Sequence, residues 1–474
     1  MTRPTLFFAA ATLAFLLAPK PGASADSPPN ILIVTADNLG YGDLRCYRPE
    51  SPIPTPNLDA FAASGARLTD FYTASPTCTV SRACLLTGRI PERHGLKQQL
   101  PGIAGNYGVG LNPAEKIIPA YLKRAPVPYA TGCFGKWNIG FAPGSRPTER
   151  GFDEFLGHAS GNIDYRTHVY DGKHDLFRGT EEFDATGQYS TDLFADAAIG
   201  FVSRHSAAGR PWFCYLPFNA PHFPNKKNKA PGVEPVWQAP DRAFAACGLS
   251  PDETDPAKRY AAVVWALDEA FGRVLAALDR LGMTGDTVVV FTSDHGECLG
   301  EHGIEFLHQE LYPETTHVPL ILSWPGGPRG ERVDSATPHL DLGRTLLDLA
   351  GLRDAAFPGR SLADAPGARE PLHAISSLGL SASVQDDGWL LVLHMKEHAL
   401  LGEGARRYAL HEVELFHLDD DPGCLRELRE AEPARARRLR AQLVAWLLDA
   451  SEAGLSQDAE LDAKALATLE QLGY

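Results

Sequence analysis

Residues 29–37 read PNILIVTAD, and inside this stretch Ile31–Val34 is a short run of apolar residues that closely precedes Asp37. Four other runs of the same kind are bounded by turn residues: Tyr129–Phe134, Trp212–Phe218, Thr287–Phe291 and Val318–Leu322. Short, continuously apolar runs are typical of strands that are buried on both faces of a sheet. The sequence therefore predicts a central sheet covered by helices.

Helical patterns lie between these runs. The clearest is Ala257–Leu281, in which apolar residues recur with a helical period and Gly282 ends the pattern. Strands that alternate with helices predict an α/β fold. Residues 140–210 are rich in glycine, charge and aromatic residues, and we expect them to form excursions over one edge of the sheet.

Polar residues closely follow four of the predicted strands. They are Asp37, Lys136, Asn219 with His222, and Asp294 with His295. In open α/β sheets, ligands bind at the carboxyl ends of the strands. Helix caps and turns also use Asp and Asn, but four strands that each deliver such residues favour a functional site at this edge.

The composition limits the class of protein. The chain has 474 residues, with 44 Lys and Arg against 59 Asp and Glu, and 44% of its residues are hydrophobic. This is typical of a globular protein and excludes a disordered or fibrous one. The formal charge of −15 argues against binding to nucleic acid or to an anionic membrane, because the summed field repels polyanions.

The N-terminus has the pattern of a secretory signal peptide. Arg3 precedes an apolar run over Leu6–Ala18, and Ala23–Ala25 is a small-residue cleavage pattern. We expect residues 1–25 to be removed near Ala25 and the product to be secreted or periplasmic. No later stretch is long and apolar enough to span a bilayer. The sequence leaves the disulfide pairing of its eight cysteines open.

The texture changes after Pro358, which suggests a smaller C-terminal α+β domain. Trp389–His394 and Glu414–Leu418 have the pattern of strands, Asp419–Gly423 is a strong turn signal, and Pro433–Leu448 is an amphipathic helix. We predict a catalytic domain over residues 26–356 and a second domain over 357–474.

Residues 75–89, SPTCTVSRACLLTGR, predict a helix that begins near Pro76 and Thr77 and ends at Gly88. Cys78 would then lie at the N-terminus of this helix, where the helix dipole favours an anion and lowers the pKa of a thiol. A small cysteine buried in the core would fit the local sequence equally well.

The segment Cys78–Arg89 resembles the signature of the sulfatase family, Cys-x-Pro-Ser-Arg followed by x-x-Leu-x-Thr-Gly-Arg. Further motifs in the same order resemble that family: 29–37, 54–59, 135–137, 220–222, 293–297, 317–320 and 414–423. The resemblance implies the alkaline-phosphatase-like fold, with a large mixed sheet flanked by helices.

The resemblance also implies roles for individual residues. Sulfatases use a formylglycine, made from the signature cysteine by a formylglycine-generating enzyme, whose hydrated aldehyde attacks sulfur; here that cysteine is Cys78. Arg82 would hydrogen-bond this group, while Lys136 and His222 would hold the sulfate oxygens. His308 lies where the family places a residue near the leaving-group oxygen and would be the general acid.

A metal site is implied as well. Sulfate and carboxylate oxygens suit a hard dication, and the resemblance implies one Ca²⁺. The implied metal-site residues are Asp37, Asn38, Cys78, Asp294 and His295.

Three residues depart from the family pattern. Val80 replaces the proline that the modifying enzyme reads, Asn38 replaces the second acid of an Asp-Asp pair, and Asn138 replaces a histidine. Asn38 removes one negative charge from the metal site, and Asn138 cannot act as a base near neutral pH.

The leading hypothesis is an exported Ca²⁺-dependent sulfatase that acts on a small-molecule or carbohydrate sulfate ester. One alternative is a phosphoester or phosphonate ester hydrolase of the same superfamily. The three departures motivate another alternative, a catalytically impaired sulfatase-like binding protein.

Overall fold

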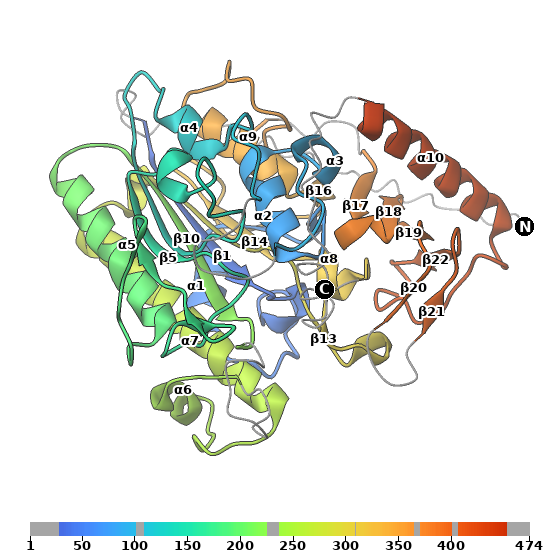
Figure 1. Cartoon of the computed structure of the whole chain (residues 1–474), viewed down its shortest axis with the longest axis horizontal. Helices are drawn as coiled ribbons and strands as arrows, with labels where there is room; N and C mark the ends of the chain where they lie inside the picture. The colour runs from blue at the N-terminus through green and yellow to red at the C-terminus, as the bar shows by residue number, and fades with distance from the viewer. Residues whose placement is uncertain are drawn as a thin grey trace, which may run out of the picture.

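The computed structural model describes residues 28–100, 109–224, 237–308, 310–364, 370–400 and 406–452. Its centre is a ten-stranded mixed sheet in the order β15-β2-β14-β11-β1-β10-β4-β5-β8-β9 (Figure 1). The strands that form the middle of this sheet are parallel: β11 (Thr287–Ser293), β1 (Asn30–Asp37), β10 (Trp212–Pro221), β4 (Ala130–Lys136) and β5 (Glu154–His158). The predicted sheet is confirmed, and its predicted strands correspond to β1, β4, β10, β11 and β14.

Shorter strands extend the sheet on both sides. On one side, β14 pairs antiparallel with β11 and β2, and β15 pairs parallel with β2. On the other side, β8 pairs antiparallel with β5 and with β9. These strands are β14 (Leu320–Ser323), β2 (Ala66–Leu68), β15 (Glu331–Val333), β8 (Phe177–Arg178) and β9 (Glu181–Glu182).

Helices cover both faces of the sheet because successive side chains of β1 alternate between two cores. Leu32 and Val34 pack in the core that includes residues of α1 (Pro56–Ser64), α5 (Ser190–Ala207) and α7 (Pro256–Arg280). Ile31 and Ile33 pack in the core that includes residues of α2 (Cys78–Thr87), α4 (Ile118–Leu122) and α9 (Leu340–Leu349). Every residue of β1, β10 and β11 is buried, as their apolar sequences predict.

The predicted glycines at the ends of α7 and α2 both follow their helices in a left-handed conformation, and Gly282 has a φ of 67°. The cap at the start of α7 was not predicted. The Asp255 side chain caps α7 by accepting hydrogen bonds from the backbone N–H groups of Ala257 and Lys258. Gly88 follows α2 with a φ of 68°, a left-handed conformation that glycine adopts without steric cost.

Residues 140–210 are more than the excursions that we expected. Besides loops, they contain β5, which joins the parallel part of the sheet, and α5, which packs against β10 and β4. Short strands such as β5 have too few residues for the sequence pattern to separate them from loops.

A four-stranded antiparallel sheet lies beyond the main one, in the order β17 (Leu372–Ile375), β18 (Ser381–Asp386), β19 (Trp389–His394) and β22 (Val413–His417). Leu439 and Leu443 of α10 (Pro433–Glu452) pack on one face of it. Its other face packs against Ile304, Leu311 and Tyr312 of the larger unit. The domain boundary near residue 356 stays a prediction.

The remaining elements are short. They are η1 (Tyr41–Asp43), β3 (Phe71–Tyr72), α3 (Pro91–His94), η2 (Pro147–Glu149), β6 (Val169–Tyr170), β7 (Lys173–His174), α6 (Asp241–Ala246), η4 (Thr284–Asp286), β12 (Cys298–Leu299), η5 (Glu301–Gly303), β13 (Glu305–Leu307), α8 (Pro313–Thr316), β16 (Thr337–Pro338), η6 (Ser377–Gly379), β20 (His398–Ala399) and β21 (Arg407–Tyr408).

All eight cysteines lie in the part of the chain that the structure describes, and each is a free thiol there. Among the described helices, none combines the length and apolar character that crossing a membrane requires. The predicted signal peptide, residues 1–25, lies outside the described residues.

Candidate active site

The carboxyl ends of the central strands meet beside the N-terminus of α2. Asp37 ends β1, Lys136 ends β4, Asp294 directly follows β11, and Cys78 is the first residue of α2. All four side chains are buried. The fold therefore brings together residues that are far apart in the sequence, as the strand pattern predicted.

Two cations bind the two aspartates. Lys136 Nζ lies 2.7 Å from both carboxylate oxygens of Asp37. Arg82 NH2 lies 3.3 Å from Asp37 Oδ1 and 2.9 Å from Asp294 Oδ2. Arg82 also donates a hydrogen bond to the backbone oxygen of Lys136, at 3.1 Å. Since every charge in this network is buried, each one depends on its partners to offset the loss of water.

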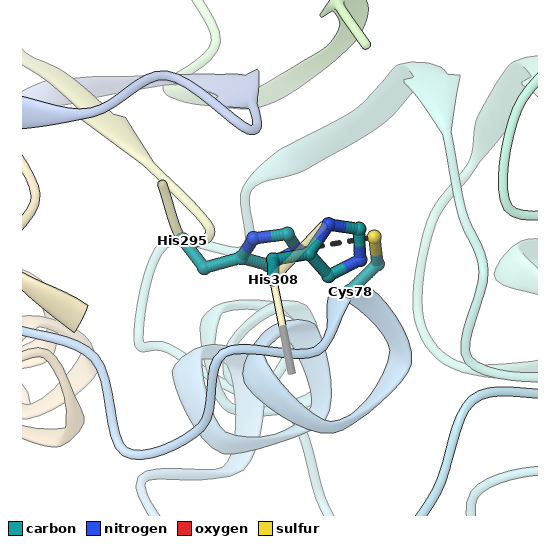
Figure 2. Close-up of side chains that lie close together, drawn as sticks. All are labelled: Cys78, His295 and His308. Carbon is teal, nitrogen blue, oxygen red and sulfur yellow. Dashed lines mark hydrogen bonds between the residues drawn. The ribbon is translucent and has the colours of Figure 1, made fainter. Parts of the chain in front are cut away.

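Cys78 contacts this network through Asp37, and Figure 2 shows it beside His295 and His308. Its Sγ is 3.7 Å from Asp37 Oδ1, 3.9 Å from Asn38 Oδ1 and 3.1 Å from His295 Nε2. Burial by itself raises the pKa of the thiol, but Lys136 and His295 outweigh it, so the pKa lies well below its ordinary value. The environment of Cys78 thus stabilises an anion, unlike that of a cysteine packed in an apolar core.

His308 joins the site through a carboxylate that the sequence analysis gave no role. Its Nδ1 lies 3.1 Å from Glu297 Oε1, and Glu297 Oε2 accepts a short hydrogen bond from Asn38 Nδ2. Burial lowers the pKa of His308, but the Glu297 carboxylate and the Cys78 side chain raise it to about 10. The ring of His308 lies 4.4 Å from that of His295 (Figure 2). Glu297 is the last residue of the motif 293–297, but the motif does not indicate its contacts. Its partners Asn38 and His308 are 259 and 11 residues away in the sequence.

His222 faces the same site from the end of β10. Its Nδ1 donates to the backbone oxygen of Phe223 at 2.7 Å, and its ring centroid lies 6.1 Å from that of His308. Burial lowers the pKa of His222, against an opposing interaction with the Cys78 side chain, so the ring is neutral at neutral pH. Asn219, from the same strand, accepts a hydrogen bond from Ser190 at 3.0 Å and is held away from this cluster.

The departures from the family signature are all part of buried packing. Val80 is fully buried beside Ala74 and Cys84. Asn138 Oδ1 accepts hydrogen bonds from Thr79 at 3.2 Å and Gln99 at 3.1 Å. Asn38 and Asn138 have φ angles of 68° and 54°, a left-handed conformation that asparagine tolerates better than most residues.

The group of this site that is richest in carboxylates could hold a metal ion: ligand atoms of Asp37, Cys78, Asp294 and His295 lie within 4.8 Å of one another. The carboxylate oxygens, with Asn38 Oδ1 beside them, suit a hard cation such as Ca²⁺. His295 donates Nδ1–H to the backbone oxygen of Gly296 at 2.8 Å, which leaves its Nε2 directed at Cys78. This nitrogen is a poorer ligand for Ca²⁺ than oxygen, so the oxygen donors fit the ion best.

A model of the sulfatase family matches residues 29–352. The chain is 34% identical over 367 residues to "N-acetylgalactosamine-6-sulfatase" from Sus scrofa, a match that covers 71% of this chain and 66% of that protein. The chain thus spans about two thirds of the length of such curated relatives.

Two solved structures share the fold. "Ps i-CgsB", also solved in complex with k-i-k-neocarrahexaose, has a TM-score of 0.75 and 26% identity, with 94% of this chain and 97% of that chain covered. The phosphonate monoester hydrolase SpPMH from Silicibacter pomeroyi has a TM-score of 0.61 and 20% identity, with 92% and 98% covered. The expected alkaline-phosphatase-like architecture is confirmed.

Proposed function

This chain belongs to the sulfatase family, and on that premise we propose that it is a hydrolase that cleaves sulfate esters at the site around Cys78. The observation that carries the proposal is the convergence of Cys78, Arg82 and Lys136 with two buried aspartates at one edge of the sheet. A sulfate needs cations that hold its oxygens beside the nucleophile, and this arrangement supplies them.

The nucleophile of the proposed reaction is a formylglycine made from Cys78, which supplies a hydrated aldehyde whose second hydroxyl permits release of the sulfate. Arg82 and Lys136 would hold developing negative charge at this position. The low pKa of the Cys78 thiol supports this role, because the cations that lower it favour any anion there.

His308 is the proposed general acid. Its raised pKa, to about 10, keeps the ring protonated at neutral pH, so it could give a proton to the departing alcohol oxygen. Glu297 would be a positioning residue, since it acts through His308 and holds that charge in place. His222 donates its Nδ1–H to Phe223, so Nε2 of the neutral ring has no proton to give. It would hold a sulfate oxygen as a donor once Nε2 takes up a proton, which the bound anion would favour.

We further propose one Ca²⁺, which when bound would offset the charge of the sulfate. Asp37, Asn38 and Asp294 would hold it through oxygen, with His295 and the modified residue 78 beside them. Burial, helped by the neighbouring Asp294, raises the pKa of Asp37 against the opposing effect of Lys136. A dication bound beside Asp37 would favour its carboxylate form and so lower that pKa.

The proposed substrates are sulfate esters of carbohydrates. This rests on the curated relatives, one of which is an N-acetylgalactosamine-6-sulfatase, and on the related structure that binds k-i-k-neocarrahexaose. Export through the N-terminal signal and modification by a formylglycine-generating enzyme complete the proposal, with catalytic residues in 26–356 and a smaller domain in 357–474.

The test begins with co-expression of the full chain with a formylglycine-generating enzyme. Mass spectrometry of the peptide Leu68–Arg82 would show whether Cys78 has been converted. Sulfate release would then be measured on N-acetylgalactosamine 6-sulfate and sulfated carrageenan oligosaccharides, beside matched phosphate esters. We expect release of sulfate, a preference for sulfate over phosphate, and loss of both conversion and activity in Cys78→Ala.

Cys84→Ala is the matched control, because Cys84 is a buried cysteine of the same helix outside the cluster around Cys78. A preference for phosphate or phosphonate esters would support the alternative hydrolase. Converted protein that binds these sugars but releases no sulfate would support the binding protein instead.

A further inference from the structure

A second cluster of potential metal ligands lies outside the proposed active site, where the C-terminal sheet meets the segment that follows His308. It comprises Glu310, His394 at the end of β19, and His398 in β20. One ligand atom from each of the three lies within 4.8 Å of the others. Glu310 and His394 are buried, and the His398 side chain is only 7% exposed.

Both histidines are oriented by hydrogen bonds of one ring nitrogen. His394 Nε2 lies 3.1 Å from Glu414 Oε2, so it donates there and its Nδ1 carries the lone pair. His398 Nδ1 lies 3.0 Å from the backbone oxygen of Lys396, so donation there leaves Nε2 with the lone pair. Histidines that bind metals characteristically donate their other N–H to a carboxylate or a backbone carbonyl.

Neighbouring side chains fix the orientation of the His394 ring. The ring of His394 stacks on Tyr408, with centroids 3.9 Å apart. Glu414 also pairs with Arg406 at 2.6 Å and accepts a hydrogen bond from Tyr312 at 3.2 Å. Glu414 is therefore held as a carboxylate that accepts from His394, and the tautomer of His394 follows from it.

The inner atoms of the cluster lack partners. Among the described residues, His394 Nδ1 and Glu310 Oε2 are buried atoms with no hydrogen-bond partner. Glu310 Oε1 lies 3.2 Å from His398 Nε2. Four ligands at about 2.0–2.1 Å in a tetrahedron are about 3.3 Å apart, so this separation suits two ligands of one Zn²⁺ as well as it suits a hydrogen bond.

We propose that Glu310, His394 and His398 bind a Zn²⁺ ion that joins the C-terminal sheet to the segment carrying His308. Two imidazoles and one carboxylate suit Zn²⁺, while Ca²⁺ prefers a set of oxygens. A proton shared between His398 and Glu310 would explain only the contact between these two residues. It would leave His394 Nδ1 and Glu310 Oε2 buried without a partner. A bound metal removes the free-energy cost of burying these unpaired atoms.

The test uses the full chain in a Cys78→Ala background, because Cys78 with His295 and His308 could also bind Zn²⁺. After treatment with a chelator, Zn²⁺ would be titrated in competition with a chromophoric chelator, and Co²⁺ would be added separately to record its visible spectrum. We expect one Zn²⁺ per chain and the intense visible bands of tetrahedral Co²⁺.

Glu310→Gln and His398→Gln should each weaken Zn²⁺ binding by about 100-fold or more. Loss of a residue that only orients a metal ligand already weakens binding by about 10- to 100-fold, and loss of a ligand itself should weaken it at least as much. The matched control is His417→Gln in β22, a strand of the sheet that carries His394; His417 pairs with Asp420 at 2.8 Å and lies outside the cluster. Circular dichroism would establish that each variant is folded. Absence of a Zn²⁺ site in the Cys78→Ala protein, or equal affinity in all three variants, would overturn the proposal.

Discussion

The buried histidine His317 predicts that acid destabilises this protein. Its ring stacks between Tyr41 and Tyr72, with centroid distances of 3.9 and 4.5 Å, and its Nε2 lies 2.7 Å from the backbone oxygen of Thr69. Burial lowers the pKa of His317 to about 4, although the hydrogen bond to Thr69 opposes this. In the unfolded chain the ring regains its ordinary pKa of about 6.5.

Lowering the pH reduces the free energy of unfolding through His317. Between these two pKa values the unfolded state binds more protons than the folded state. The His317 contribution to stability is therefore fully present above about pH 6.5 and is lost as the pH falls towards 4. Between pH 7 and pH 5 the unfolded chain gains about 0.7 proton at this site, for an ordinary pKa of about 6.5. The free energy of unfolding should fall by about 2 kcal/mol through His317 alone.

The measurement is urea unfolding of wild type and His317→Phe at pH 7 and pH 5. Phenylalanine keeps a ring between the two tyrosines but cannot bind a proton. It also loses the Thr69 hydrogen bond at both pH values, and this constant loss cancels when each protein's own drop is compared. We expect the drop to be about 2 kcal/mol smaller in the variant. An exposed-histidine control, His411→Asn, should keep the wild-type drop. The same drop in His317→Phe and wild type would refute the reasoning.

Three predictions concern the proposed active site. Cys78→Ser should fold normally but lose about 10³-fold or more in kcat, and mass spectrometry should find sulfate retained on its serine after incubation with substrate. His308→Gln should lower kcat by about 10²- to 10⁴-fold on alkyl sulfates and much less on activated aryl sulfates, because only a poor leaving group needs the proton; equal losses on both would argue against a general acid. Asn38→Asp should lower the half-saturating Ca²⁺ concentration by about tenfold, since ligand charge sets Ca²⁺ affinity; titration of metal-free protein with Ca²⁺ measures this, and unchanged affinity would place the ion away from Asn38.

The long, regular features of the fold could be predicted from the sequence. β1, β10 and β11 are buried on both faces, so their apolar runs stand out without knowledge of their neighbours. The 25-residue helix α7 repeats its apolar period often enough to be recognised. Asp37 and Lys136 end β1 and β4, and Asp294 directly follows β11, so their meeting at one edge is a consequence of parallel pairing.

Other features depend on contacts that no local pattern encodes. Glu297 acquires its place in the site from Asn38 and His308, which reach it from different segments. The cluster of Glu310, His394 and His398 forms only where β19 and β20 meet the segment that carries Glu310, and Glu310 and His398 are 88 residues apart in the sequence. Isolated histidines and glutamates are common on protein surfaces, so their spacing carried no signal for a metal.

The contacts of Asn38, Val80 and Asn138, the three residues that depart from the family pattern, help to decide whether the site catalyses hydrolysis or only binds a sulfate ester. Asn38 donates to Glu297, so a carboxylate of the site is paired even though position 38 carries no charge. Asn138 Oδ1 accepts hydrogen bonds from Thr79 and Gln99, and Val80 is packed without exposure. The cations around Cys78 are retained with both aspartates paired to them. A site that had lost its chemistry would have no need for this buried charge, which costs several kcal/mol per ion to desolvate. Its retention around one thiol with a lowered pKa therefore favours turnover over binding alone.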